Sequence, residues 1–115
     1  MFQYQAEVIR VVDGDTIDAL IDLGFSVWVK KRIRLHGIDA WESRTRDLQE
    51  KAKGVQAKDR LLDILNNCGG KFMLKSHGIG KFGRCLGEIY IDTSDTSINE
   101  MLVNEGHAVK YSGKR

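Results

Sequence analysis

The chain has 115 residues, enough for one domain with one modest hydrophobic core. Its formal net charge is only +2, so binding to nucleic acid through general electrostatic attraction alone is not predicted. No apolar run approaches the ~20 residues that would span a bilayer, and no membrane association is expected.

The amino-terminal residues 1–7 lack the basic and then apolar pattern of a signal peptide, so a cytoplasmic location is the default expectation, with a trimmed presequence left open. Cys68 and Cys85 lack the close spacing of a zinc site. They are expected to be reduced, mostly buried thiols, and a disulfide between them is the alternative. No feature predicts an oligomeric state.

The first third of the chain has the pattern of three β-strands. Residues 3–12 are rich in β-branched side chains and end at a turn signal, Asp13-Gly14. Residues 16–23 and 26–36 alternate between apolar and polar positions, as half-buried strands do. Arg34 projects away from the apolar face of its strand, so its charge need not be buried in the main core. The expected inward residues are Ile17, Ala19, Ile21, Leu23, Val27, Val29, Ile33 and Leu35.

The remainder alternates between helices and strands. A charge-dense stretch, 43–51, is either a loop or the start of a helix that is clear over 52–67, with a buried stripe. Strands are expected at 71–76 and 84–92, with a flexible glycine-containing connection between them. A capping box at 97–100 begins a short helix that stops at Gly106, and 107–111 is extended. The helical stripe is Ala57, Leu61, Ile64, Leu65 and Cys68. A single domain, 1–115, with a five-stranded OB-fold barrel and helices is predicted.

The stretch from Arg34 to Glu42 carries the residues with the clearest chemical potential. The guanidinium of Arg34 matches a phosphate, whereas the carboxylate of Asp39 suits calcium or magnesium. Phosphodiester hydrolysis needs a metal ion, a positioned water and cations near the phosphate. Asp15 and Asp39 can hold the metal, Glu42 can orient or deprotonate the water, and Arg84 supplies a second cation beside Arg34.

Two other motifs are rejected. The Asp13-Gly14-Asp15 turn lacks the glycine position of an EF-hand loop, and a strand follows it. Residues 78–83 match a dinucleotide-binding spacing but precede no helix, so only Lys81 and Phe82 are kept, as a phosphate and a base contact. The three histidines are too scattered to predict metal ligands. Trp28 and Trp41 are more often packing residues, although Trp41 is the better candidate for contact with a base.

Three motifs in order identify the chain as similar to the staphylococcal nuclease family. They are residues 12–16 (VDGDT), 33–42 (IRLHGIDAWE) and 81–84 (KFGR), and residues 98–106 (INEMLVNEG) resemble the family's helix after the barrel. The resemblance runs from about residue 5 to residue 111. It implies an OB-fold barrel and a calcium-dependent endonuclease that acts on DNA and RNA, single strands preferred, and leaves 3′-phosphate ends; Mg²⁺ or another divalent ion is an alternative cofactor.

The resemblance also implies roles for single residues. Asp15, Asp39 and the backbone carbonyl of Ala40 match the calcium ligands, and Arg34, Arg84 and Glu42 match the catalytic residues. Lys81, Phe82 and Tyr111 fall where the family contacts substrate, with Phe82 in place of the usual tyrosine.

The chain departs from the family pattern in three places. Ala40-Trp41 stands where many members have Thr-Pro, the sequence after Glu42 differs, and the third, carboxy-terminal helix is lacking. The alternatives are an inactive OB-fold module that binds single-stranded nucleic acid or a protein, and a purely structural barrel. Retention of all five matching charged residues favours the enzyme.

Overall fold

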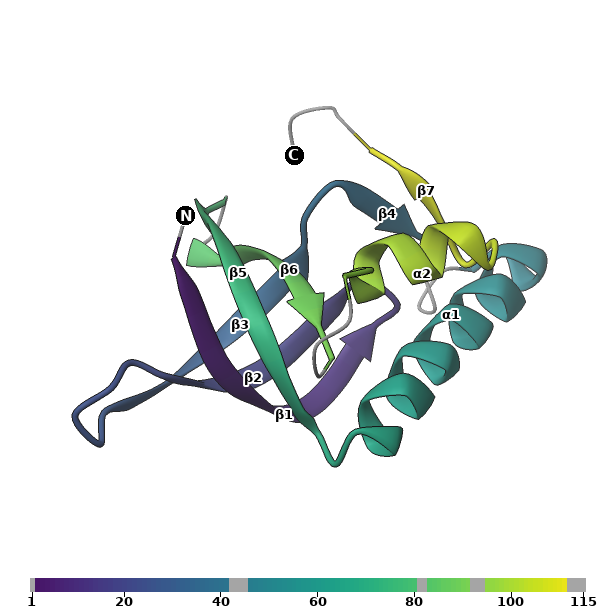
Figure 1. The fold of residues 1–115 in the computed structure, drawn as a ribbon. Helices are drawn as coiled ribbons and strands as arrows, with labels where there is room; N and C mark the ends of the chain where they lie inside the picture. The colour runs from purple at the N-terminus through teal and green to yellow at the C-terminus, as the bar shows by residue number, and fades with distance from the viewer. Residues whose placement is uncertain (1, 42–45, 81–82, 92–94, 112–115) are drawn as a thin grey trace.

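The computed structural model describes residues 2–41, 46–80, 83–91 and 95–111. Seven strands and two helices lie in these ranges, and Figure 1 shows their arrangement. In chain order they are β1 (Gln3–Asp13), β2 (Thr16–Asp22), β3 (Trp28–Leu35), β4 (Ile38–Ala40), α1 (Leu48–Asn67), β5 (Lys71–Ile79), β6 (Cys85–Tyr90), α2 (Ile98–Asn104) and β7 (Ala108–Lys110).

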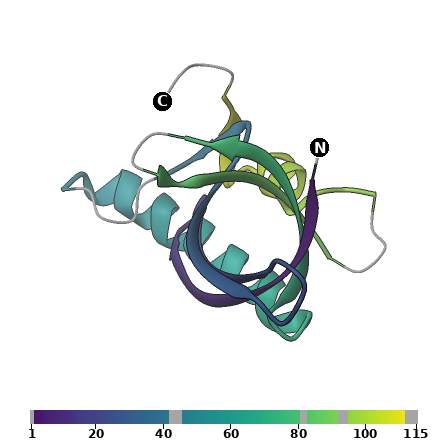
Figure 2. The same cartoon turned by 90° about the vertical axis from the view of Figure 1, so that its left-hand side faces the viewer.

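Five of the strands form a closed barrel in the order β1-β2-β3-β6-β5. Figure 2 looks into the barrel and shows these strands as a ring. Only the pairing of β3 with β6 is parallel; the other pairings in the ring are antiparallel. The predicted five-stranded OB-fold barrel with helices is therefore confirmed.

The hydrophobic core fills the barrel and continues beneath the two helices. Ile17, Ile33 and Leu74 are fully buried strand residues, and Leu61 and Leu102 bring in α1 and α2. The predicted stripe on α1 is correct, because its buried side chains include Ala57, Leu61, Ile64 and Leu65, with Cys68 packed against the core.

Two residues expected on the inward face are exposed. Leu23 and Val27 lie beyond the ends of β2 and β3, in a loop that extends past the barrel. This loop is visible at the lower left of Figure 1. The apolar alternation of the sequence continues past the last residue that the barrel can bury, so periodicity alone overestimates the buried part.

Both helices begin at polar caps. The carboxylate of Asp47 accepts hydrogen bonds from the backbone amides of Gln49 and Glu50, so α1 begins within the charge-dense stretch. The hydroxyl of Ser97 accepts from the amide of Glu100, as the predicted cap of α2 requires. No described helix has the length and apolar character needed to cross a membrane.

Two strand predictions are wrong in detail. Residues 38–40 form β4, which pairs with β7, although the sequence indicated only a turn there. Strand β5 was predicted to end at residue 76 but continues to Ile79. Its register with β6 shifts between Ser76 and Gly78, so His77 is an extra residue of β5. The two cysteines are free thiols, Cys85 buried and Cys68 partly buried.

Candidate active site

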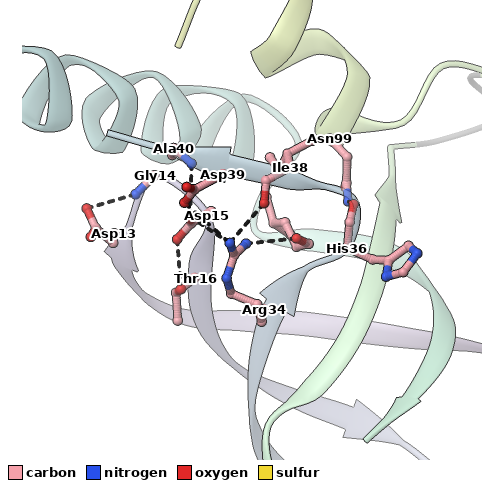
Figure 3. A network of polar contacts seen from close by, with 11 residues as sticks. Asp13, Gly14, Asp15, Thr16, Arg34, His36, Ile38, Asp39, Ala40 and Asn99 are labelled. Carbon is pink, nitrogen blue, oxygen red and sulfur yellow. Dashed lines mark hydrogen bonds and ion pairs between the residues drawn. The ribbon is translucent and has the colours of Figure 1, made fainter. Parts of the chain in front are cut away.

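Arg34 lies at the centre of a polar network between β3, β4 and the β1–β2 turn (Figure 3). Its side chain is off the barrel interior, as strand parity predicts, but it is nevertheless buried, with 3% of the residue exposed. Nη1 donates to the carbonyl of Leu35 at 2.9 Å, and Nη2 donates to the carbonyl of Ile38 at 2.9 Å. These two bonds fix the orientation of the guanidinium before any ligand binds.

Asp15 connects the β1–β2 turn to both β3 and β4. Its Oδ2 accepts from the amide of Ala40 at 3.0 Å and lies 3.2 Å from Nη2 of Arg34. Its Oδ1 accepts from the hydroxyl of Thr16, and its backbone carbonyl accepts from the amide of Leu35. The carboxylate is buried, and the protein supplies the hydrogen bonds that a buried charge requires.

Asp39 brings a second carboxylate to the same guanidinium. Its Oδ1 lies 3.6 Å from Nη2 of Arg34, so the carboxylates of Asp15 and Asp39 both approach one nitrogen. The side chain of Asp39 is 35% exposed, whereas that of Asp15 is 9% exposed. Asp39 therefore forms the solvent-facing edge of the pair, where a ligand could reach it.

The donor chemistry of this site fits a hard divalent cation. Two carboxylates meet beside the backbone of Ala40, and oxygen donors suit calcium or magnesium. No group of three or more His, Cys, Asp or Glu side chains within the described ranges could hold a metal ion. Water, a backbone carbonyl and a substrate oxygen would have to complete the coordination.

The structure relates the other predicted site residues to Arg34 less directly. Arg34 pairs with Leu86 across β3 and β6, so half-buried Arg84 lies two residues from the partner of Arg34. Trp41 follows β4 directly and is 37% exposed, with the ammonium of Lys53 4.6 Å from its ring centre. Glu42, Lys81 and Phe82 lie outside the described residues, so their predicted roles stay predictions.

Tyr111 borders a separate cavity of about 720 Å³ between β4, β6, α2 and β7. Its amide donates to the carbonyl of Gly37 at 2.8 Å, which extends the pairing of β4 with β7. This contact places Tyr111 beside the segment that leads from Arg34 to Asp39.

A histidine pair on the same side of the barrel was missed by sequence reasoning. The rings of His36 and His77 stack with centres 4.0 Å apart, and Nε2 of His77 lies 3.1 Å from Oε1 of Glu88. The hydroxyl of Tyr90 donates to Oε2 of Glu88 at 2.7 Å. The pair forms because His77 is the extra residue of β5, a register shift that spacing along the sequence does not reveal.

These contacts shift the pKa values of the groups involved. Partial burial, and then the neighbouring His77, lower the pKa of His36, although Glu88 opposes this. The hydrogen bond to Glu88 raises the pKa of Tyr90 to about 12. Burial raises the pKa of Glu88, but Tyr90, His77 and Lys75 together lower it below its usual value. The side-chain amide of Asn99 stabilises this region by donating hydrogen bonds to the backbone carbonyls of His36 and Gly87.

The chain matches a family described as staphylococcal nuclease homologue over residues 32–115. A micrococcal nuclease from Shigella flexneri is 33% identical over 120 residues, which cover 96% of this chain and 62% of that protein. Protein ParB from Escherichia coli is 28% identical, with 95% of this chain and 58% of ParB covered. Endonuclease YhcR from Bacillus subtilis (strain 168) is 34% identical over 95% of this chain but only 9% of YhcR.

The chain thus spans less than two thirds of the length of each of these relatives. The family match nevertheless includes β3 from Arg32 onward, β4, both helices and β5 to β7. It contains Arg34, Asp39 and Arg84, and the fold is the one that the resemblance implies. The protein therefore belongs to the staphylococcal nuclease family.

Proposed function

We propose that this protein is a metal-dependent endonuclease that hydrolyses phosphodiester bonds of DNA and RNA, with calcium as the preferred ion and 3′-phosphate ends as products. The observation that carries the proposal is the buried guanidinium of Arg34, held by two carbonyls beside the carboxylates of Asp15 and Asp39. Two of the similar proteins carry the names of a nuclease and an endonuclease, which supports the same reaction class.

Each described residue has a role in this proposal. Asp15 and Asp39, with the carbonyl of Ala40, would hold the cation, which polarises a phosphoryl oxygen when it is bound. Arg34 supplies fixed positive charge where negative charge builds up on the phosphate, and its carbonyl contacts reduce the reorganisation that this requires. Arg84, which directly precedes β6, is also assigned to stabilise the negative charge on the phosphate.

Glu42 is assigned to the attacking water. It would orient this water, or accept its proton, during in-line attack on the phosphorus. Lys81, Phe82, Trp41 and Tyr111 are assigned to substrate binding. Of these, Trp41 is supported by its position, because the residue is 37% exposed directly after β4. Single strands are the preferred substrate in this proposal, since an unpaired base can stack on an aromatic ring.

A gel assay tests the proposal directly. Single-stranded DNA, double-stranded DNA and RNA are incubated with the protein in calcium, in magnesium and in excess chelator. Cleavage in calcium that disappears with chelator is expected, and cleavage unaffected by chelator would remove the metal assignment. Primer extension from the products should require prior phosphatase treatment, because a 3′-phosphate blocks a polymerase.

The rival function is binding without catalysis. An inactive OB-fold module would retard the oligonucleotides on a native gel and leave them intact under every metal condition. A protein that neither binds nor cuts nucleic acid would contradict both functions.

A further inference from the structure

The loop between β2 and β3, together with the first residue of β3, presents four large apolar side chains to solvent. We define residues 23–32 as the hairpin arm; it contains this loop and residues 28–32 of β3. Phe25 is fully exposed and Trp28 is 47% exposed, and Leu23 and Val27 are also exposed. Four such side chains at one projecting end of the hairpin form a patch of the kind that proteins use to bind partners.

The backbone of this loop is held in an uncommon conformation. Phe25 and Ser26 have φ angles of 56° and 63°, in the left-handed region that residues other than glycine rarely adopt. The amide of Leu23 donates to the carbonyl of Val27, and the carboxylate of Asp22 accepts from the amide of Gly24 at 2.8 Å. These bonds maintain a turn whose tip displays an aromatic ring, and residues with this kind of backbone strain cluster at functional sites.

Positive charge follows the aromatic tip along β3. Lys30, Lys31 and Arg32 are consecutive and exposed. Arg32 and Arg10 share the carboxylate of Asp18, at 2.9 Å and 3.0 Å, so this row across β1, β2 and β3 keeps one net positive charge. The arm therefore combines aromatic rings with cations, the combination that binds single-stranded nucleic acid without sequence preference.

The arm is continuous with the candidate active site. Trp28, Lys30 and Arg32 point to the same face of β3 as Arg34, because every second residue of a strand does so. No register shift interrupts the pairing of β2 with β3. Six residue-to-residue steps along the strand lead from Trp28 to Arg34, a span of about 20 Å. About six stacked nucleotides would cover that distance.

We propose that the hairpin arm is an accessory binding site for single-stranded nucleic acid, in which Phe25 and Trp28 stack on bases and Lys30 contacts a phosphate of a strand that continues to Arg34. This inference rests on the proposed function and adds a second contact region, remote from the chemistry. A lipid surface could accept the same apolar tip, but the shared strand face with Arg34 favours nucleic acid.

Binding is measured in excess chelator, so that cleavage does not enter the result. The probes are fluorescent oligothymidylates of 15 and 3 nucleotides, because the shorter one cannot span the distance from Arg34 to Trp28. The double variant F25A/W28A is compared with the parent and with L62A, which shortens an exposed apolar side chain on α1. Thermal unfolding verifies that each variant is folded.

F25A/W28A should bind the 15-mer at least about 25-fold more weakly, since each stacked base contributes at least about fivefold. Binding of the 3-mer and binding by L62A should be unchanged. K30A should reduce the slope of log affinity against log salt by roughly 0.7, the value for one phosphate that is no longer neutralised.

The inference is overturned if F25A/W28A binds the 15-mer as well as the parent does, or if the parent does not bind it. It is also overturned if the variant loses affinity only for phosphatidylserine vesicles, because the tip would then be a lipid contact. Cleavage in calcium is assayed separately. A parent that binds through the arm but does not cut would contradict the proposed function alone.

Discussion

The contacts of Arg34 are made by neighbours from three separate elements. The carbonyl of Leu35 belongs to β3, that of Ile38 to β4, and the carboxylate of Asp15 to the β1–β2 turn. A buried cation with this many partners is both a structural residue and a source of preorganised charge. Its two roles can be separated only by measuring stability and activity on the same variant.

Arg34→Lys is the variant that does this. Lysine keeps the charge but cannot donate to both carbonyls from a planar fork, so about 1–3 kcal/mol of unfolding free energy should be lost. The cleavage rate should fall about 100-fold or more, because one preorganised donor set is removed from the phosphate. Urea unfolding and the gel assay measure the two effects.

The control for this variant is Arg60→Lys. Arg60 lies on α1, and its guanidinium pairs with Glu105 and Asp63 far from Arg34 in the sequence. The Arg60→Lys substitution should lower the free energy of unfolding slightly and leave the cleavage rate unchanged. If Arg34→Lys cleaved DNA as fast as the parent while folded, the catalytic role of Arg34 would be wrong.

At the scale of elements, helix α1 approaches the β1–β2 turn through a glycine. A Cβ added to Gly14 would lie 2.7 Å from the Cβ of Ala57 and 3.1 Å from that of Ala40. Gly14 does not have a positive φ, so the glycine is required by the close approach of α1 and not by the turn conformation. This packing places Asp15 against β4, since the next residue along the turn carries the carboxylate.

Gly14→Ala should therefore destabilise the protein by about 1–3 kcal/mol through overpacking. Ala57→Gly alone should cost about 1 kcal/mol, because glycine is a poor residue in a helix interior. The double variant should be more stable than the sum of the two single losses predicts, since the contact is relieved. Urea unfolding of all four proteins tests this, and simple additivity would refute the packing explanation.

The same elements show what could be predicted from the sequence. Strands β1 to β3 and helix α1 are visible as local patterns, and the motif around Arg34 and Asp39 is recognisable because its residues are close in the chain. Strand β4 is three residues long and has no local signal of its own, whereas the extended stretch at 107–111 was predicted and contains β7; that the two pair with each other could not be read from the sequence. The role of Gly14 depends on a contact with Ala57, and the stack of His36 on His77 depends on a register shift.

For the whole molecule, the shifted pKa values of Asp18, Glu105 and His36 all favour the fold at higher pH. The hydrogen bond from Arg32 lowers the pKa of Asp18, and that from Arg60 lowers the pKa of Glu105. Each carboxylate stabilises the fold above its ordinary pKa, and the contribution is lost as the pH falls through the lowered value. The neutral form of His36 is likewise favoured by the fold, because the pKa of His36 is lowered.

The unfolded state therefore binds more protons than the folded state in two pH windows. As the pH falls below about 6.5, His36 takes up its proton at a higher pH in the unfolded chain than in the folded protein. Below about pH 4.5 the same is true of the carboxylates of Asp18 and Glu105. The free energy of unfolding should accordingly decrease as the pH falls from 7 to 5, and decrease again below 4.5. Because His36 is exposed and water screens its charge, the first decrease should be the smaller one.

His36→Gln tests the upper window. The substitution removes the titrating ring that stacks on His77, so the free energy of unfolding should change less between pH 7 and pH 5 than it does in the parent. His107→Gln is the control for the upper window, because His107 lies outside the stacked pair; its neighbour Glu105, 4.0 Å away, contributes only to the lower window. Urea unfolding at half-unit pH intervals gives the slopes. A parent slope that His36→Gln leaves unchanged would show that other groups set the pH dependence, and a parent whose stability rises on acidification would contradict the expected sign.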